Sequence, residues 1–259
     1  MTMVDRRGFL TGVGAACALA LTPKFASAAP VPALRAGAES RPLAAVYRGP
    51  ASSPGCPEAV ATLLQNCPRN FRTVYVGPGE QTPLTASALA NAAVYAQPGG
   101  PTLATGWAAM SEYADIVRRY VGDGGVYLGF CLGGYLAGAT PGFGLLPGDT
   151  WRYISAPDAT VKTAGASRIT VNWRGAAQTL FFQDGPAFRI AGGQAEILAT
   201  YAGGQPAALV APYGAGRVGV VGPHPEADGT WFGRMDRTGA IHPELGFDLV
   251  EASLGALRV

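Results

Sequence analysis

One cysteine of this chain lies between glycines in a segment typical of a reactive residue. Residues 126–136 read Val-Tyr-Leu-Gly-Phe-Cys-Leu-Gly-Gly-Tyr-Leu, which places Gly129 and Gly133 two residues before and two after Cys131. Small residues there let a strand turn sharply into a helix and expose the side chain between them, the geometry of a nucleophile elbow. The helix start also brings N–H groups that favour a thiolate and can hold an oxyanion. An unreactive cysteine in a glycine-rich turn fits the pattern equally well.

A histidine and a glutamate supply the partners that a cysteine nucleophile needs. The strand-like run 217–222 leads into Pro-His-Pro-Glu, and Pro225 biases His224 towards an extended backbone. Side chains two residues apart on an extended chain project to the same side, so Glu226 can orient the imidazole of His224. The imidazole takes the thiol proton and the carboxylate fixes its tautomer. We therefore predict a catalytic triad of Cys131, His224 and Glu226.

The other histidine, His242, also stands in a His-Pro-Glu triplet, but that triplet opens a predicted helix. Pro243 at the first helical position and Glu244 in the first turn are ordinary helix-start signals, so we interpret His242 as a capping or surface residue. A metal site built from both His-x-Glu pairs has suitable residue types. With only two histidines, 18 residues apart, it is disfavoured, and no metal site is predicted.

The segment Gln97-Pro-Gly-Gly ends the third predicted strand and is a candidate for one half of an oxyanion hole. Glycines at positions 99 and 100 permit close approach of backbone N–H groups to a substrate, although any Pro-Gly-Gly also makes a plain turn. We expect Gly99 or Gly100 to supply one donor and the N–H of Leu132, directly after the cysteine, to supply the second.

These motifs carry a family resemblance. Gly-x-Cys131-x-Gly followed far downstream by His224-x-Glu resembles the Cys-His-Glu signature of class I glutamine amidotransferase domains, and the chain is most similar to the amidotransferase-like domain at the N-terminus of some biotin-protein ligases. The resemblance spans roughly residues 40 to 255. The segments that carry it are 47–50, 97–100, 128–135, 181–186, 198–201 and 222–226. It implies an amidotransferase-like fold with a Pro-Gly-Gly turn in the oxyanion hole. It does not imply biotin chemistry, because too little chain remains to hold a ligase's catalytic and biotin-binding regions.

Alternating strand-like and helix-like segments predict the fold. The first half shows strands at 43–47, 71–76, 94–97 and up to residue 130, with helices near 57–66, 84–91 and 107–120. The second half shows β-branched and aromatic runs at 169–173, 179–182, 197–201, 208–212 and 218–221, and a last helix at 243–256. We therefore expect an α/β fold with a flavodoxin-like parallel sheet flanked by helices and an antiparallel β extension in the second half. In such sheets ligands bind at the carboxyl ends of strands, where the elbow lies.

The N-terminus has the features of an export signal. A twin-arginine start at Arg6-Arg7 precedes an apolar stretch over 10–21 and the small-x-small triplet Ala26-Ser-Ala28. The apolar stretch is shorter than the about 20 residues of a membrane-spanning helix. We predict a twin-arginine signal peptide at 1–28, a flexible leader at 29–41 and one domain at 42–259. The protein would then be periplasmic or extracellular, with no membrane association after cleavage.

Removal of the signal leaves three cysteines, an odd number for an exported protein. A disulfide between Cys56 and Cys67 is disfavoured, because a continuous helix between them would separate their Cα atoms by about 16 Å. Cys56 follows the first predicted strand and so belongs to the same sheet edge as the elbow. It could approach Cys131 as a redox partner or a substrate-loop residue, or be a loop cysteine without a role.

Composition limits the remaining possibilities. The chain is 48% hydrophobic and 14% charged with a net charge of +2, and loss of the signal leaves the domain close to neutral. With no basic run, we expect no nucleic-acid partner, and no cofactor is predicted. Two function classes stay open: an exported cysteine hydrolase acting on a small-molecule or amide-containing substrate, and a non-catalytic binding or accessory module. Neither identifies a protein partner.

Overall fold

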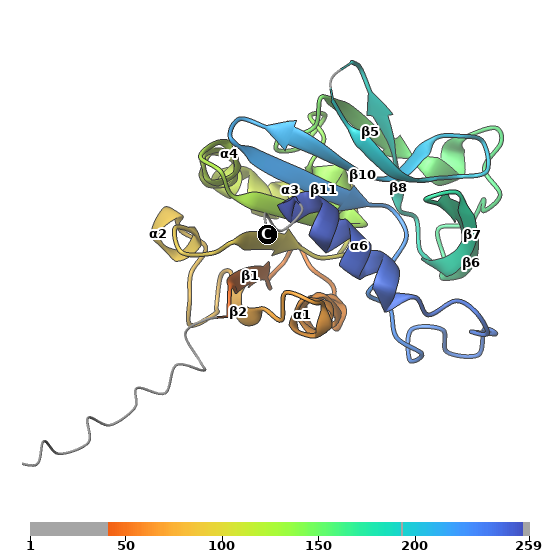
Figure 1. The fold of residues 1–259 in the computed structure, drawn as a ribbon, viewed down its shortest axis with the longest axis horizontal. Coiled ribbons are helices and arrows are strands. Elements are labelled where there is room, and N and C mark those ends of the chain that lie inside the picture. Colours follow the sequence, from red (N-terminus) through yellow and green to blue (C-terminus); the bar gives the residue numbers. More distant parts are fainter. Residues whose placement is uncertain (1–40, 193, 256–259) are drawn as a thin grey trace, which may run out of the picture. The chain divides into compact units, whose positions relative to one another are not determined.

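The computed structural model describes residues 41–192 and 194–255, and its core is a nine-stranded sheet in the order β2-β1-β3-β4-β11-β10-β9-β6-β7 (Figure 1). The first five strands of this order run parallel. They are β2 (Arg72–Val76), β1 (Leu43–Tyr47), β3 (Val94–Gln97), β4 (Val126–Phe130) and β11 (Gly216–Val221). The central strands β3 and β4 are buried along their whole length, which explains why their sequences are apolar except at Gln97.

The remaining strands form the antiparallel extension that the sequence predicts. Each pairs antiparallel with its neighbour. They are β10 (Pro206–Tyr213), β9 (Glu196–Thr200), β6 (Ser167–Trp173) and β7 (Ala176–Phe182). A separate two-stranded sheet, β5 (Gly148–Arg152) with β8 (Pro186–Ile190), was not predicted. The residues of β5 are half-buried or exposed throughout, so the strand lacks the alternating pattern by which strands are recognised.

Helices cover both faces of the sheet and enclose two separate clusters of buried apolar side chains. One face carries α1 (Cys56–Asn66) and α6 (Pro243–Leu254), each with a proline in its first turn. The other carries the remaining four helices. They are α2 (Ala86–Leu89), α3 (Leu103–Met110), α4 (Ala114–Gly122) and α5 (Leu132–Leu136). This layered arrangement confirms the predicted fold class.

Two predicted helices differ from the structure in their bounds. The sequence suggests a single helix at 107–120, but the segment forms α3 and α4 joined by a short 3-10 turn at Ser111–Tyr113. Helix α3 begins earlier because the hydroxyl of Thr102 accepts a hydrogen bond from the N–H of Thr105, which is an N-cap. Helix α2 is also shorter than the predicted 84–91 and is capped in the same way by Thr85.

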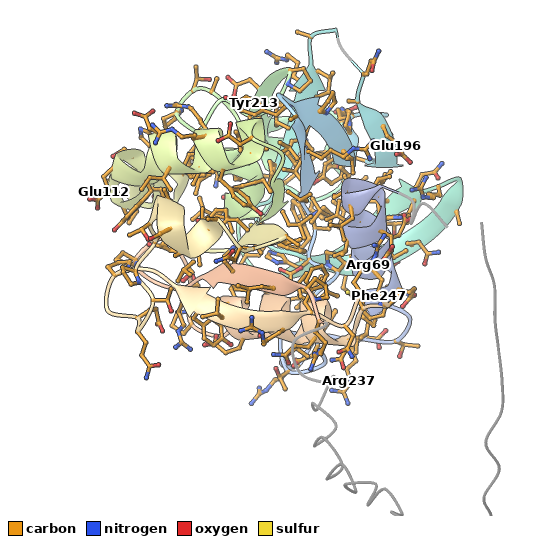
Figure 2. All side chains as sticks on the ribbon, turned by 60° about the vertical axis from the view of Figure 1, so that its left-hand side comes forward. Arg69, Glu112, Glu196, Tyr213, Arg237 and Phe247 are labelled. Carbon is orange, nitrogen blue, oxygen red and sulfur yellow. The ribbon has the colours of Figure 1, made fainter. Side chains whose placement is uncertain are left out.

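Apart from the buried Glu226, the charged side chains of the described residues lie at or near the surface of the domain, as the labelled Glu112, Glu196 and Arg237 illustrate (Figure 2). Arg69 connects the end of α1 with α6: its Nε lies 2.9 Å from both carboxylate oxygens of Glu251, and its Nη2 donates to the carbonyl of Gly255. Among the helices that the structure describes, none has the length and apolar character required to cross a bilayer.

The topology brings four segments that are distant in sequence to one edge of the sheet. Because the strands are parallel, their carboxyl ends lie at the same edge. The segments that follow β1, β3, β4 and β11 begin at Arg48, Pro98, Cys131 and Gly222 respectively. The predicted site residues therefore start from neighbouring positions on the sheet. The predicted signal peptide and nearly all of the predicted leader lie outside the described residues.

Candidate active site at the carboxyl edge of the sheet

Cys131 occupies a sharp turn between β4 and α5. Its backbone angles, φ 48° and ψ −101°, lie in a region that side-chain-bearing residues rarely adopt, and it is the N-cap of α5. The glycines on either side are required by space: a Cβ on Gly133 would lie 2.0 Å from the carbonyl oxygen of Gln97, and one on Gly129 would lie 2.5 Å from the carbonyl oxygen of Gly133. The turn has the shape of a nucleophile elbow.

Two strands fix the position of Cys131. Its N–H donates to the carbonyl of Val221 at the end of β11, with a distance of 2.9 Å. Its thiol lies 3.6 Å from the carbonyl oxygen of Gln183, which follows β7. The side chain is nearly buried but lines a cavity of about 690 Å³, a size common for small-molecule sites.

His224 and Glu226 form a buried pair beside this cysteine. Nδ1 of His224 lies 2.8 Å from Oε1 of Glu226, and the two residues are 4% and 6% exposed. The backbone N–H of His224 donates to the carbonyl of Phe181, which attaches the segment after β11 to β7. Because Glu226 holds Nδ1, the imidazole has Nε2 free to interact with the thiol of Cys131.

The charges around His224 stabilise its protonated form. Burial by itself lowers the pKa of His224. The negative charges of Glu226 and Cys131, with hydrogen bonds to both side chains, outweigh burial and raise the pKa to about 10. Glu226 carries its second oxygen, Oε2, buried without a hydrogen-bond partner among the described residues. Its charge is therefore compensated mainly by the imidazole of His224.

The Pro-Gly-Gly turn after β3 lies directly against these side chains. A Cβ on Gly99 would be 3.1 Å from Cε1 of His224 and 3.8 Å from Cβ of Cys131. The turn is fixed from the neighbouring loop, because the N–H of Ser53 donates to the carbonyl of Gly99 at 3.1 Å. Within the described chain, the N–H groups of Gly99, Gly100 and Leu132 donate to no protein acceptor. Both glycines and Leu132 line the cavity.

The cavity also contains residues to which the sequence assigns no role. The turn after β7 contributes Gln183 and Asp184, and the segment after Glu226 contributes Trp231. The ring of Trp231 lies 5.1 Å from the imidazole of His224 and 5.4 Å from Phe181. Asp184, whose φ is 52°, is bound by two nitrogens of Arg152. The only indication in the sequence is that 181–186 is one of the segments that carry the family resemblance.

Of the second histidine and the other cysteines that the structure describes, only Cys56 lines the cavity. Cys56, Cys67 and Cys131 are free thiols, and Cys56 lines the same cavity as Cys131. His242 is the N-cap residue of α6 and its Nδ1 lies 2.6 Å from Glu244, apart from the cavity. Among residues 41–192 and 194–255, no three His, Cys, Asp or Glu side chains are grouped as a metal site requires.

Known proteins provide a fold assignment. Residues 44–146 match the family described as biotin-protein ligase, N terminal. A glutamine amidotransferase crystal structure covers 81% of this chain and 98% of its own, at 19% identity and a TM-score of 0.57. A candidate GMP synthase component from Thermoplasma acidophilum covers 82% of this chain and 92% of its own, at 13% identity and a TM-score of 0.52.

An exo-β-1,4-mannosidase from an Opitutaceae bacterium shares the fold over 84% of this chain but only 37% of its own length, at 19% identity and a TM-score of 0.52. No curated protein sequence matches the chain significantly. At these identities the structures establish the fold and no activity. The family match, the sheet order and these similar structures lead to one assignment: the described domain has the fold of these glutamine amidotransferase structures, and its residues 44–146 are similar to the N-terminal family of biotin-protein ligases.

Proposed function

We propose that this protein is a cysteine hydrolase of the amidotransferase type, acting on an amide or related acyl substrate through Cys131, His224 and Glu226. The observation that carries the proposal is the position of the His224 imidazole, which is held by Glu226 at Nδ1 and lies with Cys131 around Gly99, at 3.1 Å and 3.8 Å from the position of a Cβ there. Nucleophile, proton carrier and orienting carboxylate come from two neighbouring strand ends, β4 and β11; Cys131 and His224 line one cavity, and Glu226 contacts the imidazole at Nδ1.

The proposed reaction follows from this geometry. The Cys131 sulfur attacks the acyl carbon, and the resulting oxyanion accepts hydrogen bonds from the N–H groups of Leu132 and of Gly99 or Gly100. The protonated His224 donates its proton to the departing amine nitrogen, which breaks the carbon–nitrogen bond and leaves a thioester on Cys131. His224 then takes a proton from water, whose oxygen attacks the thioester and releases the acid and the thiol.

The cavity wall favours an uncharged substrate. No Lys or Arg is found among the described residues that line the cavity, so a substrate carboxylate would have no cationic side chain as a partner. The carboxylate on the wall, Asp184, is already bound by Arg152, which lies outside the lining. Phe181, Trp231 and Leu132 present apolar surface. We therefore propose neutral amides or acyl compounds as the substrate class.

A non-catalytic binding module is the second candidate, and one contact favours it. The sulfur of Cys131 lies 3.6 Å from the carbonyl oxygen of Gln183, a backbone acceptor to which a neutral thiol can donate. A cysteine kept in this neutral state would line the cavity without attacking a ligand. The two candidates differ in whether Cys131 can carry an acyl group.

Acyl transfer from a neutral activated ester, p-nitrophenyl acetate, separates the two candidates. The hydrolase proposal expects an initial burst of nitrophenolate, an acetyl group mapped by mass spectrometry to Cys131, and loss of that acetyl group to water as turnover continues. Cys131→Ser should abolish the burst, whereas Cys67→Ser, at a buried position outside the cavity, should leave it unchanged. Equal acetylation of the wild type and Cys131→Ser would support the binding module.

Export by the twin-arginine route is a further part of this proposal. It is supported by the Arg6-Arg7 pair and the small-x-small triplet ending at Ala28. N-terminal sequencing of the protein expressed with an intact twin-arginine system should give a mature chain that begins at Ala29. A chain of unchanged length, found with the cells and not in the exported fraction, would contradict it.

A further inference from the structure

A second thiol lies in the cavity beside the proposed nucleophile. A Cβ on Gly99 would be 3.4 Å from Sγ of Cys56 and 3.8 Å from Cβ of Cys131. Both cysteines therefore reach within 4 Å of one point, where Gly99 has no side chain. The absence of that side chain leaves the space between the two cysteines open on this side.

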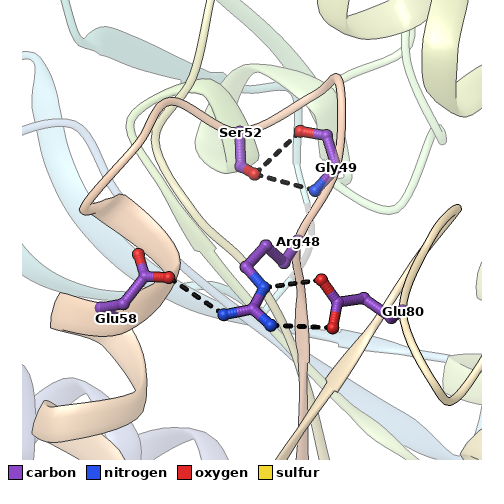
Figure 3. A network of polar contacts seen from close by, with 5 residues as sticks. All are labelled: Arg48, Gly49, Ser52, Glu58 and Glu80. Carbon is purple, nitrogen blue, oxygen red and sulfur yellow. Dashed lines mark hydrogen bonds and ion pairs between the residues drawn. The ribbon is translucent and has the colours of Figure 1, made fainter.

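Two sets of contacts fix Cys56 at this position. Its N–H donates to the carbonyl of Ser53, and the N–H of Ser53 donates to the carbonyl of Gly99, each at 3.1 Å. Arg48, at the end of β1, binds Glu80 with two nitrogens and reaches Glu58 in the first turn of α1 at 3.2 Å (Figure 3). The start of α1 is thus attached both to the Pro-Gly-Gly turn and to the end of β1.

Cys67 is excluded as the partner of Cys56 by the helix that joins them. Helix α1 runs without interruption from Cys56 to Asn66, so the two Cα atoms are about 16 Å apart at about 1.5 Å per residue. The thiol of Cys67 donates to the carbonyl of Leu64 at the far end of that helix. Of the cysteines in the described chain, only Cys56 and Cys131 line the cavity.

The surroundings of the two thiols make them chemically unequal. Burial, followed by the charges of Glu226, Cys131 and Glu58, raises the pKa of Cys56 to about 12. Cys56 is therefore a neutral thiol near pH 7 and a poor first target for an oxidant, since the thiolate is the reactive form. Cys131 shares the cavity wall with His224, whose protonated imidazole is the kind of neighbour that makes a cysteine reactive. Oxidation should begin at Cys131 and continue at Cys56.

We propose that Cys56 and Cys131 form a reversible disulfide when a hydroperoxide oxidises the site, so that Cys56 protects the nucleophile from irreversible oxidation. This inference rests on the proposed role of Cys131 as the reactive cysteine. The space beside Gly99 allows the two thiol groups to approach each other. Bond formation requires the two Cβ atoms to come within about 4.5 Å of each other.

The disulfide between Cys56 and Cys131 forms in two steps and consumes one hydrogen peroxide. The Cys131 thiolate attacks one peroxide oxygen and breaks the O–O bond, which gives a sulfenic acid and a hydroxide that takes the proton of His224. The Cys56 thiol then gives its proton to His224, and its sulfur attacks the Cys131 sulfur. The S–O bond breaks, and the departing hydroxide takes that proton from His224. In total, two thiols and one hydrogen peroxide give one disulfide and two waters, and a thiol reductant reverses the change.

The test treats the purified full chain, Cys56→Ser and Cys67→Ser with hydrogen peroxide and then with dithiothreitol, and maps every cysteine by mass spectrometry. The proposal expects a Cys56–Cys131 disulfide in the wild type and in Cys67→Ser, and full return of Cys131 alkylation after reduction. In Cys56→Ser it expects sulfinic acid at Cys131 and loss of that return.

Three results are distinguishable. Equal sulfinic acid at Cys131 in the wild type and in Cys56→Ser overturns the disulfide and leaves the proposed nucleophile intact. A Cys56–Cys67 bond also overturns it. Absence of preferential oxidation at Cys131 also overturns the disulfide, and the acetyl-transfer experiment then shows separately whether Cys131 acts as a nucleophile.

Discussion

Nδ1 of His224 and Oε1 of Glu226 lie 2.8 Å apart, and both side chains are almost completely buried. A buried carboxylate that touches an imidazole favours the imidazolium form, because leaving the carboxylate charge uncompensated in the interior is costly. The pair therefore provides a stored proton next to Cys131, which is what an acyl-transfer site needs when an amine departs.

The first prediction concerns the protonation of His224. Nuclear magnetic resonance titration of the two imidazoles should show that His224 stays protonated until about pH 10. Glu226→Gln should lower that pKa, because the Glu226 charge is the largest of the effects that raise it. Glu244→Gln, at the other His-x-Glu pair, is the matched control and should leave the titration of the His224 signal unchanged. The variant His242→Ala lacks the second imidazole and so shows which of the two signals belongs to His224. An unaltered His224 titration in Glu226→Gln would contradict the account.

The same shift predicts how stability depends on pH. The pKa of His224 in the folded state, about 10, lies above the unfolded value of 6.5. Protonation of His224 therefore contributes stability that is fully present below pH 6.5 and is lost as the pH rises through about 10. Urea unfolding should show the stability difference between the wild type and His224→Ala shrinking over this window. A stability difference between the two proteins that grows with pH would contradict this prediction.

Gly133→Ala should destabilise the fold. Its Cβ would lie 2.0 Å from the carbonyl oxygen of Gln97, a backbone atom that cannot move aside easily. We expect a loss of about 1–3 kcal/mol or more in the free energy of unfolding, the usual cost of overpacking. Gly165→Ala is the control, because its Cβ would meet only Thr163 at 3.5 Å, and it should change stability by less than about 0.5 kcal/mol. Equal stabilities of the two variants would show that the elbow is not tightly packed.

Removal of the backbone strain at position 131 should stabilise the protein. Cys131 has a φ of 48°, which alanine tolerates no better than cysteine and glycine adopts readily. Cys131→Gly should therefore be about 1 kcal/mol more stable than Cys131→Ala, the lower end of the range for such strained residues. Calorimetric midpoints of the two variants measure this difference. A less stable glycine variant would show that the turn is relaxed.

Gly99→Ala should impair acyl transfer with little effect on folding. The new Cβ would lie 3.1 Å from Cε1 of His224 and 3.4 Å from Sγ of Cys56, contacts that small side-chain shifts can relieve. It would nevertheless occupy the space between His224 and the thiols. We expect the burst with p-nitrophenyl acetate to slow by about 100-fold, as a displacement of about 1 Å can cause. An unchanged burst in a folded Gly99→Ala variant would exclude Gly99 from the site.

The sequence predicts strands well where they are continuous apolar runs, as at β4, and it predicts a helix well where a proline marks its start, as at α6. It does not reveal β5, whose residues are half-buried or exposed and show no period. The division between α3 and α4 also escapes prediction, because it depends on a 3-10 turn inside an otherwise helical pattern.

The residues of the candidate site likewise include some that the sequence predicts and some that it does not. Cys131 is recognisable because glycines lie two residues before and two after it. His224 and Glu226 are recognisable because a single residue separates them, and each of these local patterns has a chemical meaning by itself. The positions of Gln183 and Trp231 on the cavity wall depend on how β7 and the segment after Glu226 pack against the elbow. The local sequence around these two residues does not predict that packing.

The rate at which iodoacetamide alkylates each cysteine, resolved by mass spectrometry in the wild type and in His224→Ala, is the most direct measurement of the account. Cys131 should react before Cys56 and Cys67 in the wild type, and His224→Ala should slow its alkylation by about 100-fold, within the usual range for loss of a positioned acid–base group. His242→Ala should leave the rate unchanged. A Cys131 that reacts no faster than Cys67, or equally fast without His224, would contradict the proposed triad.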